Sequence, residues 1–137
     1  MPQRAEDLKP TFFQGLQPND VLFIDSAHVV RTGGDVNHLF LEVLPRLQAG
    51  VYVHVHDIFF PFEYPRSWVV EERRFWSEQY LLQAFLMYNS AFEVVWCENY
   101  MKAKFPDEIE RVLPGRFSYD DKSDASSFWM RKVAQPA

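Results

Sequence analysis

The chain has 137 residues, of which 47% are hydrophobic and 17% aromatic, and its formal net charge is −5. This length predicts a single domain, residues 1–137, and the apolar content predicts a packed core rather than disorder. An acidic balance with scattered basic residues argues against a nucleic-acid partner, because phosphate binding needs a basic face. No apolar stretch approaches the roughly 20 residues of a membrane-spanning helix, so no membrane partner is expected.

Cysteine usage indicates the compartment. Cys97 is the only cysteine, so no internal disulfide can form. Together with the missing signal peptide, this predicts a reducing, cytoplasmic environment. Cys97 lies in the apolar run FEVVWCEN, where a cysteine more often packs as a small hydrophobe than acts as a nucleophile.

The first predicted elements are a short helix near Leu8–Phe13 and a strand at Val21–Ile24. Pro10 suits the first turn of that helix, and Pro18-Asn19-Asp20 is turn chemistry before the strand. The strand is an unbroken apolar run, which is typical of strands covered on both faces in parallel sheets.

A helix follows the loop Ser26–Gly34. Asp35 is a good N-cap, and Gly50 lies just beyond the helix, where a left-handed C-terminal cap is common. The next strand is Val51–Ile58, so the segment 21–58 predicts two parallel strands joined by a right-handed helical crossover. Apolar residues at spacings of three and four define one helical face: Val36, Leu39, Phe40, Val43, Leu44 and Leu47.

The aromatic segment Phe59–Arg66 is broken by two prolines, so it is predicted to be neither helix nor central strand. It forms either a lid over a flat or apolar substrate or a loop that packs back on the sheet. The remaining predictions, in chain order, are a helix at Trp68–Tyr88, a strand at Phe92–Cys97, a short helix after Pro106 within Tyr100–Leu113, a polar loop at Ser123–Ser127 and a strand at Phe128–Val133.

Two pairs of acidic and histidine residues lie just past the ends of the first two strands. Asp25 and His28 follow one strand, and His56 and Asp57 end the other. Ligands bind at the carboxyl ends of parallel strands, so these side chains are expected to converge on one crevice. Asp25 can hold a metal, bond a cofactor amine or cap the turn. His28 suits a general base, with a loop histidine bonded to backbone as the alternative.

A metal is a further possibility at this crevice. Asp25, His56 and Asp57 would supply two oxygens and one nitrogen, a set that suits Mg²⁺, Mn²⁺ or Fe²⁺ better than structural zinc. Adjacent strand residues point to opposite faces, so His56 and Asp57 reach one ion only if the chain turns sharply there.

The stretch FIDSAHVVRTGGDVNHLFLEVLPRLQAGVYVHVHDIF resembles the second half of class I S-adenosylmethionine-dependent methyltransferases. In that fold the fourth strand ends in an ID-x-x-H turn, a helix ends in a pattern like Leu44–Gly50, and the fifth strand ends in an HD or DD pair. The closing FWMRKV resembles the seventh, antiparallel strand. The resemblance covers residues 16–133. It implies an α/β fold with a partial Rossmann-like sheet, mostly parallel with an antiparallel last strand and helices on both faces.

The resemblance also implies roles for individual residues. Asp25 and Ser26 would lie near the methionine end of S-adenosylmethionine, and His28 would be the catalytic base that takes a proton from an acceptor hydroxyl. In the metal-dependent branch the ion would be held at Asp25, His56 and Asp57. His56 stands where that branch often has an acidic residue.

The chain departs from the family at its start. None of its five glycines forms a glycine-rich strand-to-helix loop, and residues 1–20 supply neither that loop nor a ribose-binding acid. We therefore expect the C-terminal half of the fold, without the cofactor-binding half. The strand at 21–25 would then be an exposed edge, which predicts a homo-oligomer or a partner chain paired along it.

Three functions remain open at this stage. The first is a methyltransferase-like protein that acts on a small-molecule acceptor, with oxygen as the expected atom, and that is incomplete and of doubtful activity alone. The second is a non-enzymatic α/β module that self-associates through its edge and binds a partner. The third is a metal-dependent hydrolase built on Asp25, His28, His56 and Asp57, with metal-activated water as nucleophile.

Overall fold

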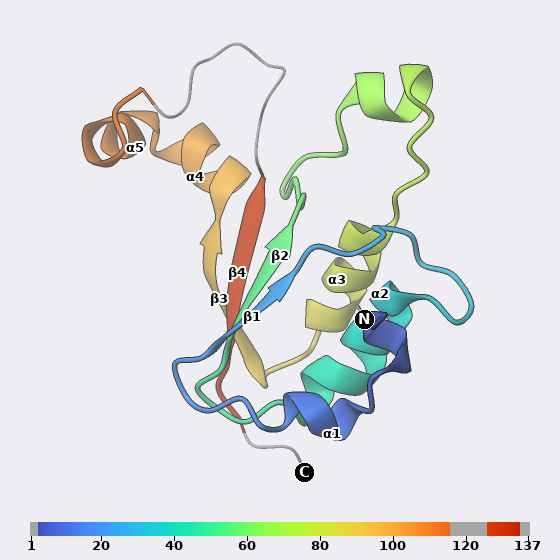
Figure 1. Ribbon diagram of the computed structural model, residues 1–137. Helices are drawn as coiled ribbons and strands as arrows, with labels where there is room; N and C mark the ends of the chain where they lie inside the picture. Colours follow the sequence, from blue (N-terminus) through green and yellow to red (C-terminus); the bar gives the residue numbers. More distant parts are fainter. Residues whose placement is uncertain (1–2, 116–125, 135–137) are drawn as a thin grey trace.

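The computed structural model describes residues 3–115 and 126–134 and contains a four-stranded open sheet (Figure 1). The spatial order of the strands is β1-β2-β4-β3. β1 pairs with β2 in parallel, and β4 runs antiparallel between β2 and β3. The predicted α/β class, the parallel pair and the antiparallel last strand are therefore confirmed. The strands are β1 (Val21–Ile24), β2 (Tyr52–His56), β3 (Phe92–Cys97) and β4 (Ser127–Lys132).

The helices are α1 (Pro10–Phe13), α2 (Asp35–Asn37), α3 (Glu78–Leu86), α4 (Glu98–Lys104) and α5 (Pro106–Val112). Figure 1 shows α1, α2 and α3 on one side of the sheet, and α4 and α5 on the other side beyond the end of β3. Pro10 starts α1 and Pro106 starts α5, as predicted. Within the described ranges, no helix is long and apolar enough to cross a membrane.

The helical crossover between β1 and β2 changes its hydrogen bonding along its length. α2 continues into a π-helical segment, His38–Val43, and a 3-10 turn, Leu44–Arg46. Pro45 has no N–H to continue an α-helical ladder. The predicted apolar face is confirmed, because these side chains are buried in the core: Val36, Leu39, Phe40, Val43, Leu44 and Leu47.

Both predicted caps of this crossover are wrong. Gly34 is the N-cap and Asp35 is the first helical residue. The Asp35 carboxylate instead accepts a hydrogen bond from the Ala27 N–H at 2.8 Å, which ties the preceding loop to the helix. Helical structure ends at Arg46, so Gly50 does not cap it. Gly50 has φ +93° in the turn into β2, and a Cβ there would lie 2.7 Å from Pro18 Cβ.

The single helix predicted at Trp68–Tyr88 is also wrong. A π-helical turn spans Ser67–Glu71, and α3 begins only at Glu78. The chain between them passes through Arg73 at φ +55°. Arg74 lies over the rings of Trp68 and Trp76, 4.1 and 5.1 Å from their centroids, and this stacking holds the break.

The last part of the chain follows its prediction with two differences. β3 has the predicted bounds but contains an irregularity between Val94 and Trp96. α4 precedes the predicted helix after Pro106. Residues 123–125 of the predicted polar loop lie outside the described residues, and Ser127 begins β4.

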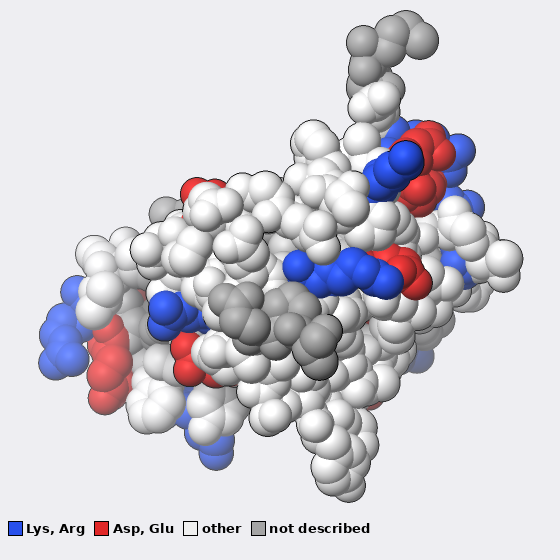
Figure 2. All heavy atoms as spheres, turned by 90° about the horizontal axis from the view of Figure 1, so that it is seen from below, with Lys and Arg blue, Asp and Glu red and all other residues white. Residues whose placement is uncertain are grey.

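The two faces of the sheet differ in cover. Val53, Val55 and Met130 are buried against the helices. On the opposite face Phe23 is 58% exposed and stacks on His54 at 4.6 Å, and Trp129 packs on His54 at 4.7 Å. Figure 2 shows another side of the molecule, where basic and acidic side chains lie next to one another and no continuous basic surface forms among the described residues.

Candidate functional site

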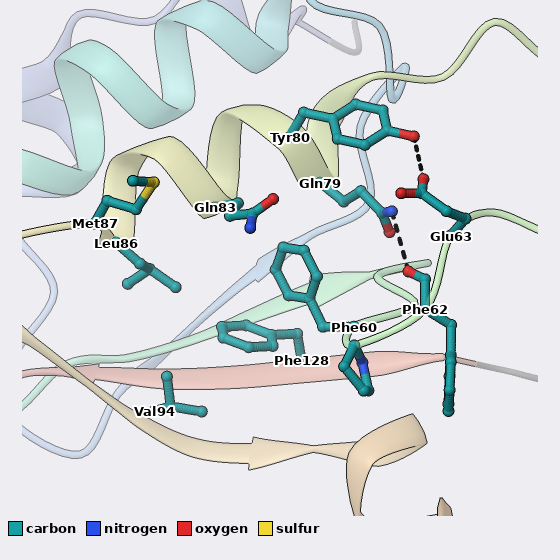
Figure 3. Close-up of a pocket in the computed structure, with 11 residues that line it drawn as sticks. Phe60, Phe62, Glu63, Gln79, Tyr80, Gln83, Leu86, Met87, Val94 and Phe128 are labelled. Atoms are coloured by element: carbon teal, nitrogen blue, oxygen red, sulfur yellow. Dashed lines mark hydrogen bonds between the residues drawn. The ribbon is translucent and has the colours of Figure 1, made fainter.

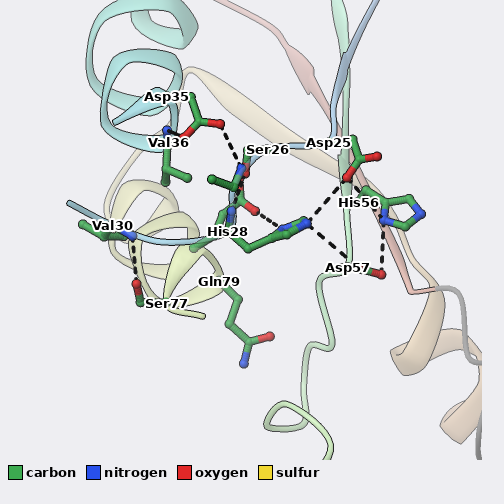
Figure 4. A network of polar contacts seen from close by, with 12 residues as sticks. Asp25, Ser26, His28, Val30, Asp35, Val36, His56, Asp57, Ser77 and Gln79 are labelled. Atoms are coloured by element: carbon green, nitrogen blue, oxygen red, sulfur yellow. Dashed lines mark hydrogen bonds and ion pairs between the residues drawn. The ribbon is translucent and has the colours of Figure 1, made fainter. Parts of the chain in front are cut away.

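The structure brings the two predicted pairs together at the carboxyl ends of β1 and β2 (Figure 4). His28 Nε2 lies 3.5 Å from Asp25 Oδ1 and 3.9 Å from Asp57 Oδ2. His56 Nδ1 lies 3.2 Å from Asp57 Oδ1 and 3.9 Å from Asp25 Oδ1. The expected convergence of these four side chains at the carboxyl ends of the two strands is therefore present.

His28 is held in an unusual backbone conformation. Its φ is +57°, and its carbonyl oxygen accepts hydrogen bonds from the N–H groups of Ser77 and Glu78 at 2.8 and 3.2 Å. The Val30 N–H in turn donates to Ser77 Oγ at 2.9 Å. The loop after β1 is thus fastened to the start of α3, and the imidazole is directed into the site.

A buried carboxylate that the sequence did not reveal partners this histidine. Glu78 has no exposed surface, and its Oε2 lies 2.8 Å from His28 Nδ1. Its Oε1 accepts the Ser26 hydroxyl at 2.8 Å, while Ser26 Oγ accepts the His28 N–H at 3.0 Å. In the neutral form of His28 we therefore assign the single ring proton to Nδ1, donating to Glu78, so that Nε2 carries the lone pair in that form.

Glu78 was missed because the predicted helix ran through it. Ser77 is a residue type that favours helix N-termini, and it occupies the N-cap position of α3. That signal would have placed the start of the helix at Glu78, but it does not reveal the contact between Glu78 and His28.

Opposing effects set the proton affinity of His28. Burial of the imidazole lowers its pKa, but the hydrogen bond and the negative charge of Glu78 raise it, and Asp57 and Asp25 add to the rise. The net result is a pKa above the ordinary value of 6.5. His28 is therefore a stronger base than a free histidine and is more often protonated at neutral pH.

The open side of the imidazole faces two carboxylates. The Asp25 side chain is 57% exposed, whereas that of Asp57 is 15% exposed. Asp57 has φ +57°, and its N–H donates to the Ser126 carbonyl at 2.7 Å. This fixes the turn after β2. The Asp25 side of the cluster is therefore more open to solvent than the Asp57 side.

An aromatic wall closes another side. The Trp76 ring lies 4.1 Å from the His28 ring, and Tyr64 packs edge-on against Trp76 at 5.9 Å. The Tyr64 hydroxyl accepts the Gln79 N–H at 3.1 Å, and burial raises the pKa of Tyr64. The wall limits water around the imidazole, which strengthens its interaction with Glu78.

The predicted metal site is not supported. Among the described residues, no group of three or more histidine, cysteine, aspartate or glutamate side chains could hold an ion. Asp25, His56 and Asp57 do approach one another, but through contacts of His56 Nδ1 with the two carboxylates. Cys97 is half-buried, its Sγ lies 3.0 Å from the Phe60 carbonyl, and burial raises its pKa. These features agree with a packing role.

The segment Phe59–Arg66 packs back on the molecule. Phe59 and Tyr64 are buried, and the Phe59 N–H donates to Gln79 Oε1 at 3.1 Å. Phe62 is 55% exposed. The loop alternative is the one observed, and the segment contributes Tyr64 to the aromatic wall.

Comparison with known proteins identifies the same part of the chain. Strands β1, β2 and β3 are mutually parallel, and β4 lies antiparallel between β2 and β3. This sheet, with its helices and the polar cluster at the carboxyl ends of β1 and β2, defines a Rossmann-like α/β domain. A model of the family described as a methyltransferase domain matches residues 3–58. This segment, which holds Asp25, Ser26, His28, His56 and Asp57, is methyltransferase-like, as the resemblance predicted. No curated protein and no solved structure matches the chain significantly.

Proposed function

We propose that this chain is the acceptor-side part of an S-adenosylmethionine-dependent methyltransferase that acts on a hydroxyl oxygen of a small molecule. The observation that carries the proposal is the state of His28. Its Nδ1 is bonded to a buried carboxylate, and its Nε2 lies 3.5 Å from the exposed Asp25 carboxylate in a segment that resembles a methyltransferase domain. A histidine held in this way suits the removal of a proton from an acceptor.

In this mechanism Glu78 orients the imidazole and stabilises the charge that forms on it. The acceptor hydroxyl would lie next to His28 Nε2, between Asp25 and Asp57, and would transfer its proton to Nε2. Glu78, hydrogen-bonded at 2.8 Å, would then face an imidazolium cation. The Trp76 wall would exclude water from that side.

The residues present fit one end of the cofactor. S-adenosylmethionine supplies an electrophilic methyl group when bound. The exposed Asp25 carboxylate can accept hydrogen bonds from a cofactor amine. Ser26 is less available than expected, because its single hydroxyl proton is donated to Glu78. On this proposal Asp25 contacts the cofactor, and Ser26 holds the Glu78 carboxylate in place through its hydrogen bond.

The remaining cofactor contacts would come from another polypeptide segment beside β1. β1 is an edge of the sheet, with Val21 48% and Phe23 58% exposed, and no glycine-rich strand-to-helix loop occurs in the sequence. A complementing segment along β1 would bring that loop next to Asp25. On this proposal the chain alone binds cofactor weakly and transfers methyl groups poorly.

The proposal is tested by isothermal titration of the purified chain with S-adenosylhomocysteine, with and without Mg²⁺. We expect measurable binding that does not depend on Mg²⁺ and that weakens roughly tenfold in Asp25→Asn, the loss of about one charge-assisted hydrogen bond. Asp107→Asn, on α5, is the matched control and should bind like the unchanged chain. Absence of binding at millimolar ligand would refute a cofactor site at Asp25.

The exposed edge also favours a second candidate, a non-enzymatic module that pairs through β1. The same titration separates the two, because a module of this kind has no reason to bind S-adenosylhomocysteine at the ends of β1 and β2.

A further inference from the structure

A cavity lies between α3, the segment after β2 and the sheet (Figure 3), and none of the residues that line it is Asp25, His28, His56 or Asp57. Its volume is about 500 Å³, within the range of small-molecule sites. Gln79 lines the cavity, and its side chain is fixed by hydrogen bonds with the Phe59 N–H and the Phe62 carbonyl. The methyltransferase-like site does not use this cavity.

The floor of the cavity is aromatic. The rings of Phe60 and Phe128 pack edge to face with their centroids 5.8 Å apart, and Figure 3 shows both between α3 and β4. Leu86, Met87 and Val94 line one end. The faces of aromatic rings carry negative electrostatic potential, so this floor attracts cations as well as apolar groups.

The opposite end carries a fixed negative charge. Glu63 Oε2 accepts the Tyr80 hydroxyl at 2.5 Å, and this hydrogen bond raises the pKa of Tyr80, which therefore remains a donor. The tyrosine occupies one carboxylate oxygen and leaves the other open. None of the described residues that line the cavity is lysine, arginine or histidine, so no internal cation neutralises Glu63 there.

We propose that this cavity binds an organic ammonium ion with an apolar body. The ammonium group would lie beside Glu63 and Tyr80, over the aromatic floor, and the apolar body would extend towards Leu86, Met87 and Val94. A carboxylate combined with aromatic faces and no competing cation selects for positive charge, whereas a purely apolar cavity would not discriminate. This binding site does not depend on the proposed methyltransferase function.

Three probes of the same shape test it by isothermal titration of the full chain: 4-phenylbutylamine, 4-phenylbutanol and 4-phenylbutyrate. We expect the amine to bind, the alcohol to bind roughly tenfold more weakly, and the carboxylate not to bind measurably. Equal affinity for the three probes would overturn the proposal, as would the absence of amine binding at millimolar concentration.

Variants locate the effect. Glu63→Gln should weaken amine binding roughly tenfold and leave alcohol binding unchanged, because only the charge is lost. Glu108→Gln on exposed α5 removes the same formal charge elsewhere and should leave both affinities unchanged. Equal loss in both variants would mean non-specific attraction to an acidic protein and would refute the site. Glu63→Gln should not alter S-adenosylhomocysteine binding, so the two proposals fail independently.

Discussion

At the scale of single residues, the site depends on a contact between residues 50 positions apart. Glu78 is completely buried, and its two carboxylate oxygens form hydrogen bonds with His28 and Ser26. The sequence placed Asp25, His28, His56 and Asp57 correctly, because strand ends can be recognised from apolar runs. It could not reveal Glu78, since the tertiary contact that brings α3 to His28 leaves no local pattern.

Glu78→Gln keeps the shape of the buried side chain and removes its charge. We expect the pKa of His28 to fall below its value in the unchanged chain, because the lowering effect of burial then meets less opposition. The free energy of unfolding should decrease by about 1–3 kcal/mol, as for other impaired buried hydrogen bonds to a charged group. NMR titration of the His28 ring and urea denaturation measure the two effects. An unchanged His28 pKa would show that Glu78 does not set it.

The raised pKa of His28 also predicts how stability varies with pH. The folded state binds the proton more tightly than the unfolded state, whose histidine has a pKa near 6.5. The stabilisation is therefore fully present below pH 6.5 and is lost as pH rises through the folded-state pKa. Urea denaturation between pH 5 and 9 should show this loss in the unchanged chain and a smaller one in Glu78→Gln. The Glu108→Gln variant should follow the unchanged chain.

At the scale of elements, the spacing of apolar residues predicted helices and strands correctly where one face is buried. It did not predict where helices end or break. The apolar face of the crossover and the strand at Phe92–Cys97 were predicted correctly. The break before α3 was not, since it rests on Arg74 packing between Trp68 and Trp76. Asp35 likewise resembles an N-cap in sequence, but its carboxylate bonds back to the preceding loop.

Two glycines offer a matched test of the turn into β2. Gly50 and Gly33 both have positive φ, +93° and +66°, but only Gly50 has Pro18 against the position of a Cβ. We expect Gly33→Ala to lower the free energy of unfolding by about 1–2 kcal/mol from backbone strain alone. Gly50→Ala should lower it more, by about 3 kcal/mol or above, because strain and steric overlap add. Thermal and urea unfolding of the two variants measure this difference, and equal losses of stability would show that the Pro18 contact is unimportant.

At the scale of the whole molecule, the open sheet leaves β1 unpaired on one side. The Tyr52 N–H bonds to the Asp20 carbonyl, so in the parallel ladder the alternate residues Val21 and Phe23 direct their backbone groups to the open edge. Two copies of one edge strand can pair antiparallel about a two-fold axis. We therefore propose that the purified chain forms a dimer along β1, unless a complementing segment occupies that edge.

Light scattering over a range of concentrations tests the dimer. The unchanged chain should have twice the mass of one copy. Phe23→Lys should be monomeric, because a charged side chain on an edge strand opposes pairing. Phe12→Lys is the control, since Phe12 is 67% exposed on α1 and is not part of the edge strand, so this variant should remain dimeric. A monomeric unchanged chain at high concentration would contradict edge pairing.

The most direct test of the central claim is residue-resolved NMR of the isotope-labelled chain during titration with S-adenosylhomocysteine. A cofactor site at these strand ends predicts saturable chemical-shift changes of backbone amides centred on Asp25–His28 and His56–Asp57. Little change is expected around Glu63 and Tyr80. Shifts confined to other parts of the chain, or none at saturating ligand, would contradict a cofactor site at these strand ends.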